Sequence, residues 1–295
     1  MTVAPGGWIT AGVAPTLPPM ATDPIPAIAE AAATGETAAL FAELRTALNV
    51  PFVNLVWRHL ATIPGGLSWT WALLRPVYAS PLLEATAREL RDGIRLRTGP
   101  LHRLVFDNLG LHVAERQAIQ AVISDYNQAN SMNVLALNIA KSVLRHGLGA
   151  HPQAVPAAAA RTPRAAPALP RLLGLDELSP ELRALVVELD KLGRNAPNPA
   201  IASLYRHLGH WPAFLALTYS TLLPLHQDGT LWAEQERLTL RAQELIATHL
   251  QPLMQDIPPL PAGADRATIL AGVESVITGR MTVMGTAMQG LLPAA

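Results

Sequence analysis

Apolar residues recur along the chain three and four positions apart, which is the spacing of one face of an α-helix. The pattern joins Leu40, Phe41, Leu44 and Leu48 in the first half, and Leu182, Leu185, Val186, Leu189 and Leu192 in the second. Segments 113–145 and 264–292 carry the longest helical patterns and contain no proline. Ser179, followed by Pro180, has the residue types of a helix N-cap and first helical position. No run of alternating β-branched residues bounded by turns occurs, so the pattern predicts an all-α fold.

The chain contains an internal repeat. Residues 50–78 align without gaps on residues 198–226, and the sequence Arg-His-Leu occurs in both copies, at 58–60 and 206–208. A weaker match aligns the segment that begins at Ala114 with the one that begins at Ala264. We therefore predict a tandem repeat of two helical halves, related by a pseudo-twofold axis, with a pocket at their seam.

Two segments rich in proline and alanine divide the chain. Residues 1–24 are expected to form a flexible N-terminal segment, and residues 151–170 a Pro/Ala linker, because proline at this density stops helices. The first helical repeat then covers 25–150 and the second covers 171–295. The two repeats are expected to form one globular unit.

The predicted helix 113–145 is unusually polar for its position. Tyr126, Asn127, Asn130 and Asn133 lie close together on it, although asparagine is a mediocre helix former. Two interpretations stay open: hydrogen bonds to solvent or a neighbouring helix, or a polar stripe that lines a cavity and orients a substrate or water. Arg280 aligns with Asn130 in the second repeat.

Arg280 also has two interpretations. A guanidinium among Met, Val and Gly needs an anionic partner when it is buried. That partner is either an acid of the chain, for which Glu274 is a candidate, or the carboxylate or phosphate of a ligand.

The histidines and acids do not form a familiar catalytic motif. Because His59 and His207 are repeated, we expect a structural role such as helix C-capping, whereas His210 has no counterpart and could act at the seam. No acid occurs between Glu43 and Glu84 or between Asp190 and Asp228, and Asp125 lies beside the polar positions of 113–145. HExxH, GxSxG, Walker and GxGxxG motifs are absent, so we expect no metal site and no cofactor.

Composition narrows the class of protein. The 295 residues include 22 Lys+Arg and 22 Asp+Glu, only 15% are charged, 50% are hydrophobic and none is Cys. A zero net charge without a basic run argues against nucleic acid, and the lack of cysteine excludes disulfides and thiolate chemistry. No signal peptide and no run of about 18 apolar residues occurs, so we expect no membrane association and a cytoplasmic location. The high apolar content is expected if a subunit interface is covered, and we predict a homodimer.

The order of several segments resembles the group I 2-haloacid dehalogenases. They are ELRTALNVPFVNLVWRHLATIPGGLSWTW (43–71), DYNQANSMNVLAL (125–137), the Ala/Pro linker and ASLYRHLGHWPAFL (202–215), and the resemblance spans about residues 25–290. It implies a duplicated all-α fold with a pocket between the repeats and activity on both stereoisomers without a covalent intermediate. It also implies an aspartate that activates a water to displace halide from the 2-carbon, and an asparagine that helps to hold this water.

Residue by residue, the resemblance is incomplete. Asn130 matches the asparagine, and Ala202 and Ser203 match an Ala-Ser pair. Leu204 stands where the family has the water-activating aspartate, and loss of such a base removes roughly 10²- to 10⁴-fold of rate. The other departures are Phe52 and Leu55 at aromatic positions, Asn133 at a tyrosine and Arg280 at an apolar wall position.

These residues suggest three functions. The leading hypothesis is a cofactor-independent enzyme that holds a small anionic organic substrate at the seam through Arg280, Asn130 and Ser203. The further binding residues would be Ala202, Leu204, Tyr126, Asn127, Asn133, Phe52 and Leu55. The alternatives are a non-catalytic ligand-binding homologue and a 2-haloacid dehalogenase that uses another base, Asp125 or His210.

Overall fold

The structure is a computed structural model that describes residues 25–96, 98–147, 169–194, 198–254, 256–276 and 279–293. The regular elements in these ranges are helices and none is a strand, which confirms the all-α prediction. The predicted flexible segment 1–24 and residues 151–168 of the predicted linker lie outside the described residues. No helix in the described ranges is both long enough and apolar enough to cross a membrane.

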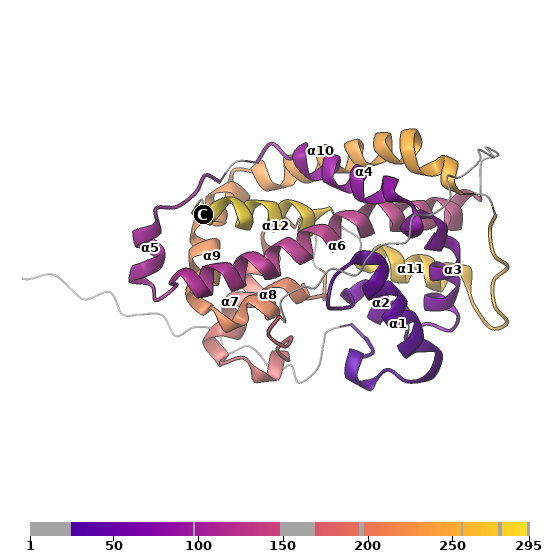
Figure 1. Cartoon of the computed structure of the whole chain (residues 1–295), viewed down its shortest axis with the longest axis horizontal. Coiled ribbons are helices and arrows are strands. Elements are labelled where there is room, and N and C mark those ends of the chain that lie inside the picture. Colours follow the sequence, from indigo (N-terminus) through magenta and orange to yellow (C-terminus); the bar gives the residue numbers. More distant parts are fainter. Residues whose placement is uncertain are drawn as a thin grey trace, which may run out of the picture.

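Figure 1 shows the helices in the two predicted halves of the chain. The first half contains α1 (Gly35–Leu48), α2 (Leu55–Leu60), α3 (Gly66–Ala79), α4 (Pro81–Asp92), α5 (Arg103–Asn108) and α6 (Val113–His146). The second half contains α7 (Pro180–Lys191), α8 (Ser203–His207), α9 (Pro212–Gln227), α10 (Thr230–Leu245), α11 (Arg266–Val276) and α12 (Arg280–Leu291). Short elements are η1 (Glu30–Ala32), η2 (Leu175–Glu177), η3 (Leu208–His210), the π-helical η4 (Ile246–Leu250) and η5 (Gln251–Leu253).

The two halves place their helices in the same order and exchange contacts. α2 and α8 begin at Leu55 and Ser203, which the internal alignment pairs, and α3 and α9, then α4 and α10, follow them. α6 of the first half packs against α8 of the second, while α11 of the second half packs against α2 of the first. A pseudo-twofold axis would produce such an exchange, and the axis itself stays a prediction.

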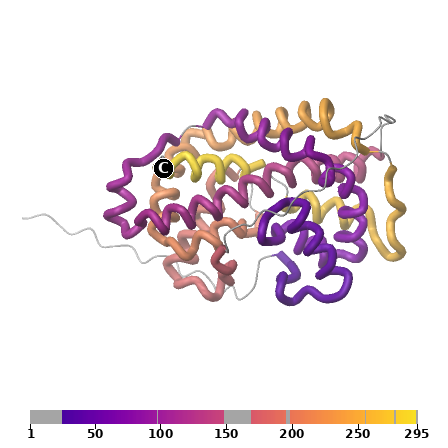
Figure 2. Tube along the Cα trace, viewed as in Figure 1, coloured from indigo at the N-terminus to yellow at the C-terminus, as the bar shows by residue number. Residues whose placement is uncertain are grey.

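Helix α6 forms the centre of the molecule. It contacts α1, α3, α4, α8, α10, α11 and α12, and side chains are buried all around it between Asp125 and Leu137. Figure 2 shows the last helix of the second half, in yellow, beside α6, in magenta. The halves are therefore interleaved along α6, and its polar residues lie where elements of both halves converge.

Local sequence signals explain several helix ends. The Ser179 hydroxyl accepts a hydrogen bond from the Leu182 N–H at 3.2 Å, and Pro180 is the first helical residue, as predicted for α7. At the end of α1, Asn49 adopts a left-handed conformation (φ 54°) and its N–H caps the carbonyls of Arg45 and Thr46.

The prediction of one long helix over 264–292 is wrong at one point. The helix stops at Val276, Gly279 lies in a turn, and α12 starts at Arg280. A Cβ at position 279 would lie 2.5 Å from Leu238 Cδ2 of α10, so a residue without a side chain is required where these segments meet. The break places Arg280 at the first position of α12.

Candidate functional site

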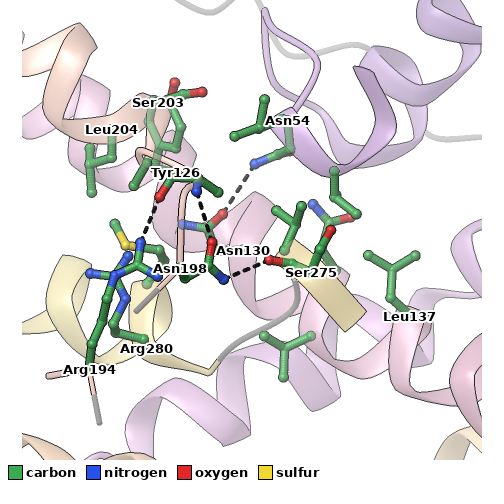
Figure 3. Close-up of a pocket in the computed structure, with 18 residues that line it drawn as sticks. Asn54, Tyr126, Asn130, Leu137, Arg194, Asn198, Ser203, Leu204, Ser275 and Arg280 are labelled. Carbon is green, nitrogen blue, oxygen red and sulfur yellow. Dashed lines mark hydrogen bonds between the residues drawn. The ribbon is translucent and has the colours of Figure 1, made fainter. Parts of the chain in front are cut away.

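A cavity of about 90 Å³ lies between elements of the two halves (Figure 3). The first half contributes the start of α2 and one face of α6, and the second contributes the segment before α8, the start of α8 and the α11–α12 region. The lining residues are Asn54, Leu55, Val56, Tyr126, Asn130, Asn133, Val134, Leu137, Arg194, Asn198, Ala200, Ala202, Ser203, Leu204, Ser275, Val276, Arg280 and Met281.

Much of this wall consists of positions that the internal alignment pairs. Residues 54–56 align with 202–204, and both triplets line the cavity. On the long helices Tyr126 aligns with Val276 and Asn130 with Arg280, and all four line it as well. Aligned positions of the two halves therefore both line the cavity, with different side chains.

Two asparagines of α6 direct amide donors to the cavity. The Asn133 Oδ1 accepts hydrogen bonds from Trp57 Nε1 (3.0 Å) and Tyr78 Oη (2.7 Å), and because the indole N–H only donates, the amide orientation is determined. This leaves Asn133 Nδ2 buried without a protein partner. Asn130 Oδ1 accepts from Asn54 Nδ2 at 3.2 Å, so its own Nδ2 is the group left to donate.

The opposite side of the cavity is cationic. Arg280 Nη2 lies 2.9 Å from Asp190 Oδ1, and Arg194 pairs with Asp190 Oδ2 and donates to the Ala200 carbonyl at 2.7 Å. The backbone N–H of Ala202 also donates to Asp190 Oδ1, at 3.0 Å. One buried carboxylate thus serves two guanidiniums, and the cluster keeps an excess positive charge beside the cavity.

The charge on Arg280 is stabilised by its surroundings. Burial lowers the pKa of Arg280, but the neighbouring Asp190 carboxylate outweighs burial and leaves the pKa above its usual value. The buried Tyr205 side chain is a further neighbour that raises the pKa of Arg280. The pKa of Arg194 is lowered by burial and by the nearby charge of Arg280. Both guanidiniums remain protonated, because arginine does not lose its proton in proteins.

Tyr126 lines the cavity and contacts a buried histidine, His207. Its hydroxyl lies 3.2 Å from His207 Nδ1, and the other ring nitrogen of His207 is hydrogen-bonded to the carbonyl of Pro170. Burial raises the pKa of Tyr126 far above its usual value and lowers the pKa of His207. Phe52 stacks on the Tyr126 ring with centroids 4.2 Å apart, which fixes the position of the phenol.

The structure brings most of the predicted site residues together. Asn130, Arg280, Ser203, Leu204, Ala202, Asn133, Tyr126 and Leu55 all line the cavity. Phe52 lies behind Tyr126, and Asn127 lies between α6 and α12, where its Nδ2 donates to Gln289 Oε1 at 2.8 Å.

Neither alternative base reaches the cavity. Asp125 is buried in α6 and is not among the lining residues. His210 is on the surface, and its Nε2 lies 2.9 Å from the carbonyl of Arg171.

Two pairings predicted from the sequence need correction. Arg280 pairs with Asp190 and not with Glu274, which pairs instead with Lys141 and Arg145. His59 and His207 do not cap their own helices. His59 Nδ1 lies 2.7 Å from the Pro26 carbonyl, near the start of the first half, and His207 is hydrogen-bonded to the carbonyl of Pro170, just before the second half.

Several lining residues were missed. Asn54 aligns with Ala202, which was a predicted site residue. Mapping Ala202 onto the first repeat by the internal alignment would therefore have identified Asn54. Asn198 is held by two hydrogen bonds, from its Nδ2 to the Ser275 carbonyl (2.9 Å) and from the Ala200 N–H to its Oδ1 (2.8 Å). No sequence signal marks Asn198 or Arg194, because their positions follow from the path of the loop before α8.

The lining residues limit the chemistry. They include two arginines, a tyrosine and several amides and hydroxyls, but no carboxylate and no imidazole. Leu204, where the resemblance expects the water-activating aspartate, is buried and lines the cavity. Within the described ranges no group of histidines and acids could hold a metal ion. The wall is suited to binding an anion, and its lining residues in the described part of the chain include no carboxylate or imidazole base.

Comparison with known proteins finds no matching family model. The chain is 25% identical over 229 residues to a configuration-inverting 2-haloacid dehalogenase of Alcaligenes xylosoxydans xylosoxydans, covering 75% of this chain and 76% of that protein. It is 24% identical over 246 residues to an (R)-2-haloacid dehalogenase of Rhizobium sp. strain NHG3, covering 81% and 93%.

Solved structures of D-2-haloacid dehalogenase have the same fold. A complex with L-LA superimposes with a TM-score of 0.74, and a complex of a mutant with D-2-CPA with a TM-score of 0.73. Each is 18% identical and covers 93% of this chain and 98% of the other. Together with the two relatives, these structures confirm the relationship that the sequence motifs predicted.

Proposed function

We propose, from the premise that the chain is a distant relative of the group I 2-haloacid dehalogenases, that its cavity binds a small 2-substituted carboxylic acid. In this proposal the protein needs no cofactor. The aspartate that activates the attacking water in the family is replaced by Leu204. The chain would then be a divergent protein with the fold of these hydrolases, which keeps the binding function but lacks the family's catalytic aspartate.

The supporting observation is a set of hydrogen-bond donors that have no acceptor in the described protein. Asn133 Nδ2 is buried without a partner in the described part of the chain, and Asn130 Nδ2 makes no hydrogen bond there. Buried donors are nearly always satisfied, and each one left unpaired costs about 1–3 kcal/mol. A carboxylate is rich in acceptors and would satisfy both.

The charge of the wall favours the same ligand. Arg194 and Arg280 share a single carboxylate, that of Asp190, so the cluster is one positive charge in excess. An anion would neutralise this excess in a setting where charge-assisted hydrogen bonds are strong. The buried Asn54 Oδ1 lacks a donor partner and is suited to a hydroxyl group or a water next to the ligand.

Calorimetric titration with 2-chloropropionate tests this proposal. We expect the acid to bind and its uncharged amide to bind at least about tenfold more weakly, because only the acid neutralises the arginine cluster. Arg280→Ala should cost about 2 kcal/mol or more of affinity for the acid.

The matched control is Arg237→Ala. Arg237 also pairs with a largely buried acid, Glu234, and also donates to a backbone carbonyl, that of Gly93 at 2.7 Å, but it does not line the cavity. Affinity should be unchanged in this variant. Equal binding of acid and amide, or equal affinities in the two arginine variants, would contradict the proposal.

A further inference from the structure

The repeated histidine of the second half occupies a place that anion binding does not explain. His207 is buried, and it lies directly behind Tyr126, which lines the cavity. In the described part of the chain, its counterpart His59 is hydrogen-bonded to a backbone carbonyl and is not among the residues that line the cavity. The two copies of the motif therefore share a backbone contact, and only one of them faces a ligand site.

The hydrogen bonds of His207 determine which nitrogen carries the proton. The Pro170 carbonyl can only accept, so the Nε2 facing it carries the hydrogen. Burial lowers the pKa of His207, so the ring is neutral at pH 7 and its Nδ1 is an acceptor. The Tyr126 hydroxyl must then donate to Nδ1 across the 3.2 Å contact.

These contacts form a continuous path from the cavity to a backbone carbonyl. We propose that Tyr126 and His207 together act as the proton acceptor of the cavity, in place of the carboxylate that Leu204 has replaced. This inference rests on the proposed binding of a 2-substituted acid.

The step balances without any further reactant. A water beside the 2-carbon gives a proton to Tyr126 Oη while Tyr126 gives its own proton to His207 Nδ1. The water oxygen bonds to the 2-carbon, and the carbon–halogen bond breaks with its electron pair leaving on the halide. The products are the 2-hydroxy acid, a halide ion and doubly protonated His207, which returns its proton to solvent.

The surroundings favour this proton transfer in two ways: they support the protonated form of His207, and they stabilise negative charge on the Tyr126 oxygen. Doubly protonated His207 can keep its hydrogen bond to Pro170, because Nε2 remains a donor. Ser203, which lines the cavity, accepts a hydrogen bond from buried Arg58 Nη2 at 3.1 Å. The charge of Arg58 opposes the effect of burial on the pKa of Tyr126 and stabilises negative charge developing on its oxygen.

Chloride release from 2-chloropropionate by the unaltered chain and three variants tests the inference. Tyr126→Phe removes the relaying oxygen, and His207→Gln keeps a donor and an acceptor but cannot take up a proton. We expect each to lower chloride release at least about tenfold. His59→Gln is the matched control from the other repeat and should release chloride like the unaltered chain.

Two readouts separate this role from a structural one. The dissociation constant should stay within about twofold in His207→Gln and His59→Gln, because neither histidine lines the cavity. Chloride release by the unaltered chain should fall as the pH drops through the pKa of His207, below 6.5. The ionisable groups that influence this pair are Tyr126, Arg58, Arg206, His210 and Glu30.

The outcomes are distinguishable. If the acid binds but the unaltered chain releases no more chloride than the Tyr126 and His207 variants, the inference is overturned and the binding function stands. If the acid does not bind, both are overturned. A ¹⁵N–¹H spectrum that shows His207 protonated on Nδ1 in the neutral form would also overturn the inference, and it remains informative if a variant fails to fold.

Discussion

The buried pairing of Asp190 with two arginines makes an asymmetric prediction about stability. Removing one partner of a buried ion pair costs about 3–5 kcal/mol, because the other charge stays buried. Arg280→Met leaves Asp190 with Arg194 and the Ala202 N–H, so we expect the lower end, about 3 kcal/mol. Asp190→Asn leaves two guanidiniums, with 4% and 13% of their side chains exposed, without a carboxylate. For Asp190→Asn we therefore expect a loss of unfolding free energy at the upper end of this range, about 5 kcal/mol.

Urea unfolding followed by circular dichroism measures both changes, and the slope with urea should be unchanged. The matched control is Glu274→Gln, which also removes one carboxylate from two cations, Lys141 and Arg145. The carboxylate side chain there is 33% exposed. Solvent screens such a site, so its loss should cost less than about 1 kcal/mol. A cost for Arg280→Met equal to or above that for Asp190→Asn would refute the reasoning.

Three further predictions follow from the cavity and its supports. Leu204→Asp should raise chloride release from 2-chloropropionate by about 10²- to 10⁴-fold, because it restores a base to the wall, whereas an equal rise in Leu204→Asn would point to another cause. Gly285→Ala should lower the free energy of unfolding by about 1–3 kcal/mol, although alanine normally favours a helix. The added Cβ would lie 2.0 Å from Asn127 Oδ1, and urea unfolding would show whether the stability rises instead. Stability should fall as the pH drops below 6.5, because unfolded His207 takes up a proton more readily than the buried ring, whose pKa is lowered. Urea unfolding across that range should show a smaller pH dependence in His207→Gln, and an unchanged dependence would contradict this account.

Features encoded by neighbouring residues were predictable from the sequence. The apolar period of α7 and its Ser179 cap involve residues within one or two helical turns, and they occur where predicted. The break before α12 was missed because it depends on Leu238 of α10, which is distant in the sequence and packs against Gly279. A helical period shows which residues can share a face, but it does not show which neighbour requires a gap.

The site residues that belong to the internal alignment or to the family pattern were predictable from the sequence. Asn130, Leu204 and Arg280 line one cavity, as their places in the repeat and in the family pattern suggested. The partner of Arg280 was not predictable, because it lies in α7 and no local pattern connects it to α12. The role of His207 was hidden for a similar reason, since the repetition suggested equal environments for His59 and His207 and only the packing of α8 against α6 distinguishes them.

Aligned positions of both halves line the same cavity, and this arrangement affects how a ligand would be oriented there. If both halves had kept the same side chains, a ligand turned end over end would meet the same groups, and its two poses would have equal energy. Here Asn130 lines the cavity from one half and Arg280 from the other, and Leu55 is matched by Ser203. Reversal would exchange an amide for a cation and an apolar contact for a hydroxyl. The differences between the two predicted repeats thus remove the degeneracy of the two poses, so the carboxylate ligand that we propose would have one preferred end of the cavity.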